Sequence, residues 1–159
     1  GAPFTLDDIA AQVASPDVRH AFGAILGDAF GAAYPDALQV QRPRLQALYR
    51  DYFARHRLDA IFFPTTPVCA VAIDGVHGSS RIAVADGAPG DAFTTLIRNT
   101  DPASNAGIPG LSLPAGMTAA GLPVGMEIDG PLGSDSRLLA IGLSLEALFG
   151  PLPAPPACV

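Results

Sequence analysis

The sequence predicts an α/β fold in which helices pack against a small sheet. Helical hydrophobic spacing recurs in separate segments, and the short runs at 59–63 and 124–128 have the composition or alternation of strands. Strand-like runs separated by helices favour layered packing over a helix bundle. With 159 residues, of which 49% are hydrophobic, the chain is long enough for one domain, predicted over 1–150, followed by a Pro-rich extended tail at 151–159.

Two helices are predicted in the first 35 residues. Thr5 and Asp8 form a capping-box-like start, and apolar residues then fall on one helical face. A second helix begins at Ser15, which is followed by proline at the first helical position. Its apolar face is expected to begin at Val18, and Gly31, with the proline four residues later, is expected to end it.

The clearest periodicity predicts an amphipathic helix over about residues 36–57. Its apolar stripe, expected to be core, consists of Leu45, Leu48, Tyr49, Tyr52 and Phe53. The buried strand predicted at 59–63 then leads into a Thr-Thr-Pro turn. Residues 74–91 are rich in glycine and proline, so we expect a loop with one weak strand at 82–85, after which 92–98 resume a helix.

The last third of the chain predicts one strand and one helix. The run at 111–113 is too short to assign, whereas residues 124–129 alternate as in a half-buried strand, with Val124, Met126 and Ile128 between Gly125, Glu127 and Asp129. A Gly-Ser-Asp cap at 133–135 predicts a final helix that ends at Gly150. The inner face of that helix is expected to consist of Leu138, Ile141, Leu145 and Leu148.

Composition excludes several functional classes. A net charge of −6 and a pI near 4.7 disfavour nucleic acid as a partner. Every apolar run is interrupted well short of 18 residues, so no membrane span or membrane partner is expected. The two cysteines are too few for a disulfide framework and lack metal-ligand spacing, so we expect a reduced, cytoplasmic setting and no metal. We expect no cofactor, since no dinucleotide or Walker phosphate motif occurs.

Two glycine- and proline-rich segments carry a family resemblance. They are NAGIPGLSLPAG at 105–116 and GLPVGMEIDG at 121–130, and SPDV at 15–18, RPRL at 42–45 and DAIFFPTTP at 59–67 precede them in order. Over roughly residues 5–150 the chain resembles the C-terminal portion of the amidase-signature family of serine amide hydrolases. It is most similar to the branch that hydrolyses arylacetamides such as indoleacetamide and mandelamide. The resemblance implies part of a mixed β-sheet flanked by helices, with the N-terminal catalytic portion missing.

The chemistry implied by this resemblance requires residues that the chain lacks. The family uses a serine nucleophile, deprotonated through a second serine by a lysine that burial keeps neutral. The chain contains no lysine, and arginine cannot act as the base because its guanidinium does not release a proton. We therefore expect no catalytic residue here and no activity from the chain alone. The expected partners are the missing N-terminal portion and a small carboxamide, which the whole enzyme would convert to carboxylate and ammonia.

The resemblance also implies that part of the chain lines the substrate pocket. The expected pocket residues, each of which is alternatively a scaffold or turn residue, are Thr65, Thr66, Pro67, Asn99 and Asn105.

Other nucleophiles receive weaker support from the sequence. Ser79 and Ser80 follow a glycine but lack the family's flanking glycines, and Ser112 lacks the second glycine of a nucleophile elbow. Cys69 has no cationic neighbour in sequence to lower its pKa. The remaining possibility is His77 acting as a base with Asp74 or Asp86, although a histidine in a glycine-rich loop is more often exposed to solvent.

Two alternative functions stay open at the sequence level. One is a noncatalytic binding module derived from the amidase fold, and the other is part of an amidotransferase A-type subunit. Strands separated from a larger sheet expose edges and apolar surface, so homo-oligomers through those edges are possible under each hypothesis.

Overall fold

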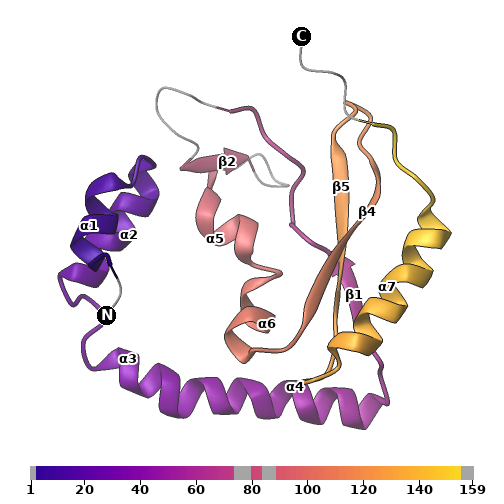
Figure 1. The fold of residues 1–159 in the computed structure, drawn as a ribbon, viewed down its shortest axis with the longest axis horizontal. Coiled ribbons are helices and arrows are strands. Elements are labelled where there is room, and N and C mark those ends of the chain that lie inside the picture. The colour runs from indigo at the N-terminus through magenta and orange to yellow at the C-terminus, as the bar shows by residue number, and fades with distance from the viewer. Residues whose placement is uncertain (1–2, 74–79, 84–88, 155–159) are drawn as a thin grey trace.

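A three-stranded antiparallel sheet forms the centre of the structure (Figure 1). The computed structural model describes residues 3–73, 80–83 and 89–154. The central strand is β5 (Pro123–Asp129), which pairs with β1 (Ile61–Pro64) on one side and β4 (Gly110–Met117) on the other. The α/β prediction is therefore confirmed.

The strand register decides which side chains share a face of the sheet. Glu127 lies opposite Phe63 of β1 and Ser112 of β4, and Asp129 lies opposite Ile61 and Gly110. Because directly opposed residues point to the same side, these positions form one face, while the alternate positions form the other.

The first two helices lie away from the sheet, at the opposite end of the molecule (Figure 1). α1 (Leu6–Gln12) begins with the predicted capping box: the Asp8 amide donates to Thr5 Oγ1 at 3.1 Å, and the Thr5 amide donates to Asp8 Oδ2 at 2.8 Å. α2 (Pro16–Leu26) starts as predicted but ends at Leu26, earlier than Gly31. Asp28 adopts a φ of 51°, which a right-handed helix cannot continue.

The apolar face predicted for α2 is not buried in this chain. Val18, Ile25 and Phe30 are 42%, 49% and 57% exposed, and none of the described residues of α1 is buried. The amphipathic pattern predicts correctly that α2 is a helix, but its contact with α1 leaves most of these apolar side chains exposed.

A continuous helical segment connects this end to the sheet. It consists of α3 (Ala33–Asp36), a π-helical turn η1 (Ala37–Gln41) and α4 (Arg42–His56). The predicted stop at Pro35 is wrong, because Pro35 lies within α3. The π turn, in which the Arg42 amide donates to the Ala37 carbonyl, comes just before Pro43, whose ring would clash with the carbonyl four residues earlier in a regular α-helix.

The predicted core stripe of α4 is only partly buried. Phe53 is 4% exposed and stacks on Tyr49 with ring centroids 6.4 Å apart. Leu48 and Tyr52 are 67% and 49% exposed, so their assignment to the core is wrong for this chain. The helix ends at Arg57, which adopts a left-handed φ of 53°.

A small hairpin and two short helices follow β1. β2 (Arg81–Ala83) pairs antiparallel with β3 (Pro89–Asp91), so part of the strand predicted at 82–85 is confirmed and the rest lies outside the described residues. α5 (Ala92–Ile97) begins where Asp91 Oδ1 accepts from the Thr94 amide at 2.8 Å. α6 (Asp101–Ala106), a helix not predicted from the sequence, ends at Gly107 with a φ of 72°.

The last helix, α7 (Asp135–Phe149), covers one face of the sheet (Figure 1). A Cβ added at Gly142 would lie 2.5 Å from Leu111 Cδ2 of β4, so this glycine permits the close packing of helix on strand. Leu138 is buried, and Ile141 and Leu145 are half-buried, as predicted. Leu148 is 76% exposed, so its predicted inward position is wrong.

The remaining parts of the fold are the edge strand β1 and the C-terminal segment. β1 pairs with β5 alone, and Phe62 is 50% exposed, so the strand predicted as buried is only half-buried. Of the predicted tail, residues 151–154 have no helix or strand, and the remainder lies outside the described segments. Among the helices of these segments, none has the length and apolar composition needed to cross a bilayer.

Candidate functional site

Hydroxyl groups from two strands meet on the sheet face opposite α7. Thr65, directly after β1, places Oγ1 2.5 Å from Ser112 Oγ of β4. The two hydroxyls meet across the central strand at Gly125, whose carbonyl accepts from the Thr65 amide at 3.0 Å. A Cβ at Gly125 would lie 3.0 Å from each hydroxyl oxygen, so the absence of a side chain there makes room for the pair.

Two other predicted site residues lie next to this hydroxyl pair in the chain or in space. Asn99 Nδ2 donates to the Pro64 carbonyl at 2.7 Å and so ties the segment between α5 and α6 to the end of β1. Thr66 Oγ1 donates to the Val68 carbonyl at 2.8 Å, which closes a local turn around the half-buried Pro67.

Asn105 is engaged within its own helix. Its Nδ2 donates to the Asp101 carbonyl four residues earlier, at 3.0 Å, and the side chain is exposed on α6. The structure therefore brings Thr65 and Asn99 together around Pro64, and no described hydrogen bond links Asn105 to them. The substrate-binding role of the five residues stays a prediction.

A buried pair of carboxylates lies on the same sheet face, toward the other end of β5. Glu127 is 7% exposed and Asp129 is 1% exposed. The alternation in the sequence predicts a strand with only one buried face. Because β5 is the central strand and its C-terminal half is covered on both faces, residues 127–129 are all buried. Sequence reasoning missed this pair, since alternation alone does not reveal which strand is central.

Gly110 of β4 opens the space that the two carboxylates occupy. A Cβ at Gly110 would lie 2.8 Å from Asp129 Oδ1 and 3.1 Å from Glu127 Oε1. Both side chains therefore point toward this glycine.

Burial controls the protonation of the pair. Loss of hydration raises the pKa of Asp129 to about 7, and the charge of the neighbouring Glu127 raises it further. Burial also raises the pKa of Glu127. The pKa of Tyr49 on α4 is raised by burial and by the charge of Asp129. Asp129 therefore retains its carboxyl proton up to about neutral pH, where an ordinary aspartate is ionised.

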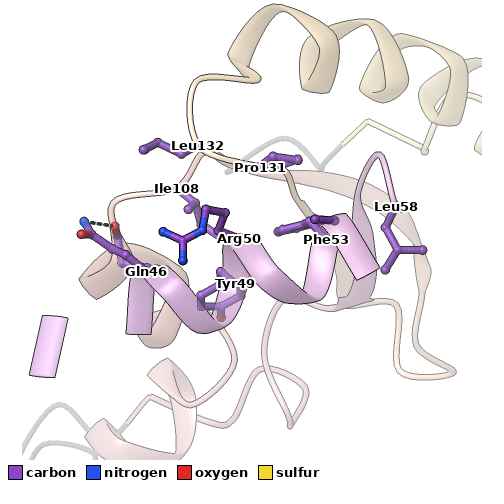
Figure 2. A pocket seen from close by; sticks show the side chains of 10 residues that line it. Gln46, Tyr49, Arg50, Phe53, Leu58, Ile108, Pro131 and Leu132 are labelled. Atoms are coloured by element: carbon purple, nitrogen blue, oxygen red, sulfur yellow. Dashed lines mark hydrogen bonds between the residues drawn. The ribbon is translucent and has the colours of Figure 1, made fainter. Parts of the chain in front are cut away.

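A separate pocket of about 570 Å³ lies alongside α4 (Figure 2). It is lined by Gln46, Tyr49, Arg50, Phe53, Ala54, Leu58, Ala106, Ile108, Pro131 and Leu132. Gln46 Nε2 donates to the Ala106 carbonyl at 2.9 Å, which joins α4 to the end of α6. Arg50 pairs with Asp51 at 3.0 Å on the surface. This largely apolar pocket contains none of the five predicted site residues.

The alternative nucleophiles receive no support from the described geometry. Ser80 is exposed in the turn before β2, where its carbonyl accepts from the Ala92 amide at 3.0 Å, and Cys69 is an exposed free thiol. Ser79, His77 and its proposed aspartate partners Asp74 and Asp86 lie outside the described residues. In the described segments, no group of three or more histidine, cysteine, aspartate or glutamate residues is arranged to hold a metal ion.

Comparison with known proteins gives consistent matches across the sheet and its helices. A family model described as Amidase matches residues 17–139. The chain is 49% identical over 144 residues to an indoleacetamide hydrolase of Agrobacterium vitis, with 89% of this chain and 30% of that protein covered. It is 40% identical over 163 residues to a mandelamide hydrolase of Pseudomonas putida, with 95% and 30% covered.

A solved structure agrees with these sequence matches. A crystal structure of an amidase superposes with a TM-score of 0.70 and 31% identity, over 86% of this chain and 29% of that one. The chain thus spans about a third of the length of the relatives that it matches.

Proposed function

Because the chain belongs to the amidase family, we propose that it forms one wall of the substrate pocket in an amide hydrolase. The observation that carries this proposal is the 49% identity to an indoleacetamide hydrolase over 89% of the chain. The proposed reaction is hydrolysis of a small carboxamide to a carboxylate and ammonia through an acyl-serine intermediate. An arylacetamide is the proposed substrate class, since the relatives are named for indoleacetamide and mandelamide.

The catalytic groups are proposed to reside in polypeptide beyond the third of the relatives' length that this chain spans. The chain has no lysine to serve as the base, so it is expected to release no ammonia by itself. Its own contribution is proposed to be binding and orientation, which raise the rate by holding the reacting groups in place.

The pair of hydroxyls at Thr65 and Ser112 is the best-supported contact for a carboxamide. A hydroxyl both donates and accepts, so the pair matches the carbonyl oxygen and the amino group of an amide. Gly125 has no side chain that would block the space beside the hydroxyl pair. Asn99 donates a hydrogen bond to the Pro64 carbonyl and so fixes the backbone next to Thr65. Thr66, Pro67 and Asn105 are proposed as further pocket residues when the remaining polypeptide is present.

An exchange of segments tests the proposal directly. The matching segment of the Agrobacterium vitis enzyme would be replaced by this chain, and ammonia release from indoleacetamide would be measured for the chimera and for the isolated chain. We expect hydrolysis by the chimera and none by the chain alone. A folded chimera without activity would contradict the hydrolase assignment. Ammonia release by the chain alone would contradict the proposal that the catalytic groups lie outside it.

The same assay separates the hydrolase from the two alternatives. Ammonia that accumulates without any acceptor present indicates a hydrolase, whereas ammonia release that depends on a second subunit indicates an amidotransferase. A chimera that binds indoleacetamide without cleaving it indicates a noncatalytic module. A cytoplasmic location is part of the proposal, and the unpaired thiol of Cys69 is compatible with a reducing compartment.

A further inference from the structure

The carboxyl group of Asp129 has no hydrogen-bond donor among the described residues. In the described part of the chain, no donor lies within hydrogen-bonding distance of either carboxyl oxygen, and both oxygens are inaccessible to solvent. Buried polar groups are nearly always satisfied, because an unsatisfied one costs free energy comparable to a lost hydrogen bond. We therefore expect this carboxyl to pair with a hydrogen-bond donor from outside the described residues.

A small acidic niche consists of Asp129, Glu127 and the backbone of Gly110, whose lack of a side chain leaves room for the two carboxylates. Gly110 is exposed and belongs to β4, which pairs only with β5 in the described sheet, so the niche lies beneath an edge strand. The titratable groups that face Asp129 are Glu127 on its own strand and Tyr49 on α4. Arg50 pairs with Asp51 and Arg137 pairs with Asp59, so neither of these two arginines occupies the niche.

Two adjacent carboxylates select a particular chemistry. A cation that donates several hydrogen bonds can satisfy both groups at once, and a planar guanidinium does so with two parallel N–H bonds. A hard metal ion requires six or more oxygen ligands, and no third acidic or histidine ligand joins this pair in the described segments. Side-chain nitrogen cations therefore match the niche better than a metal does.

We propose that the acidic niche binds the side chain of an arginine or lysine carried by the polypeptide that completes the enzyme. The inference rests on the proposed function only for the source of this cation, since the niche itself is defined by residues of this chain. Bound there, the cation would supply donors to both Asp129 oxygens and would allow both carboxylates to ionise. The niche would thus anchor the open edge of β4 to the rest of the enzyme.

The test uses the chain with small cations as probes. Protein labelled with ¹³C at the aspartate and glutamate carboxyls is titrated at pH 7 with methylguanidinium or methylammonium chloride, and tetramethylammonium chloride keeps the ionic strength constant. The Asp129 signal is assigned from its absence in Asp129→Asn. We expect a saturable shift of this signal toward the ionised form with either N–H cation. A shift no larger than that in tetramethylammonium, which has no N–H donor, would refute the proposal.

Matched glycine variants localise the effect. Gly110→Ala places a methyl group in the niche and should weaken the response at least tenfold, whereas Gly116→Ala on the same strand has open space around its Cβ and should leave it unchanged. An undiminished response in Gly110→Ala would place the cation elsewhere. If circular dichroism shows that Gly110→Ala is unfolded, Glu127→Gln replaces it and should weaken the response several-fold.

Two further outcomes separate competing explanations. A response to calcium with none to the organic cations would overturn the proposal in favour of a metal site. Because none of these measurements requires amide hydrolysis, an inactive chimera would overturn the proposed function and leave the niche intact. A chimera that hydrolyses indoleacetamide, together with a niche that binds neither N–H cation, would refute the cation site and support the proposed function.

Discussion

Asp129 is the residue whose environment departs most from what its sequence position predicts. Alternation along β5 places it on the same face as Ser112, which is exposed, yet Asp129 is 1% exposed because its end of the strand is covered on both faces. Neither Gly110 nor Ile61, its neighbours across the sheet, offers a polar side chain. Retaining a proton up to about neutral pH therefore spares the chain a buried charge, while both Asp129 oxygens stay without a hydrogen-bond partner among the described residues.

The raised pKa of Asp129 predicts a specific dependence of stability on pH. The folded-state pKa of about 7 lies above the ordinary value of 3.8, so between these values the folded chain holds a proton that the unfolded chain has lost. The free energy of unfolding should therefore decrease by a few kcal/mol as pH rises from about 4 through 7. Asp129→Asn should remove most of this decrease and be more stable than the parent at pH 8. Urea denaturation at pH 5 and pH 8 measures both effects.

Asp8 provides a control with the opposite sign. Its hydrogen bonds to Thr5 lower the pKa of the Asp8 carboxyl, so the stability that it contributes is present above the ordinary aspartate range and is lost as the pH falls below it. Asp8→Asn should therefore weaken the chain at neutral pH and have little effect in acid. A decline in stability toward alkaline pH that persists in Asp129→Asn but disappears in Asp8→Asn would reverse these assignments.

Thr65 allows the proposed substrate contact to be tested at a single hydroxyl. In the active chimera, Thr65→Val keeps the shape and removes the hydroxyl, so kcat/KM for indoleacetamide should fall roughly fivefold to tenfold, as expected for one hydrogen bond worth about 1 kcal/mol. Thr65→Ser retains the hydroxyl and should stay near the parent value. Equal kcat/KM values for the valine and parent proteins would remove Thr65 from the binding site.

At the scale of elements, the boundaries that local chemistry determines were predictable. The capping box of Thr5 and Asp8 and the stop at Gly150 need only neighbours in sequence, and both were predicted correctly. α6 carries similar signals, a proline in its first turn and Gly107 after its end, although the helix itself was not predicted. Its six residues are too short for a hydrophobic period to appear.

Which face of an element is buried was much harder to predict. An amphipathic pattern shows that a face is apolar, but burial requires a second element to cover it. Leu48, Tyr52 and Leu148 have core spacing and are nevertheless exposed, whereas the acidic residues of β5 are covered. The hydroxyl pair depends on the register of three strands, because β5 aligns β1 and β4 so that Thr65 and Ser112 meet. The sequence predicted Thr65 as a site residue but not its partner Ser112.

Two glycines inside helices separate intrinsic helix preference from packing. Gly23 of α2 has open space around its Cβ, so Gly23→Ala should stabilise the chain by about 0.5–1 kcal/mol through helix propensity alone. Gly142→Ala gains the same preference but brings its Cβ within 2.5 Å of Leu111 Cδ2, so we expect a net loss of about 1 kcal/mol. Urea denaturation of both variants tests the contrast. Equal stabilisation by the two would mean that α7 does not pack closely on β4.

At the scale of the whole molecule, the chain exposes more surface than a compact protein of its mass. Its accessible surface is 11315 Å² at 16.2 kDa, whereas a folded monomer of that mass exposes about 7500 Å². The excess agrees with the unpaired outer edges of the described sheet and with apolar faces on α2, α4 and α7. It is the surface expected of a segment that packs against further polypeptide in a larger enzyme.

The exposed leucines on the outer face of α7 predict that the isolated chain self-associates. Leu139 and Leu143 are 57% and 69% exposed on the helix side away from the buried Leu138. We expect the isolated chain to self-associate with increasing concentration, as measured by sedimentation velocity, and the double variant Leu139→Gln/Leu143→Gln to reduce this association without lowering stability. Leu138→Ala is the contrasting variant and should cost about 2–5 kcal/mol, because its side chain is core.

The outcome of this comparison decides between two sources of association. Association that persists unchanged in the double glutamine variant would assign it to the open edges of β1 and β4, where unpaired backbone groups can add a strand from another copy. In that case a charge introduced on the edge, Phe62→Lys, should suppress association, since Phe62 is half-exposed and a lysine on an edge strand opposes further pairing. If neither change has an effect, the apolar face of α2 becomes the surface through which copies meet.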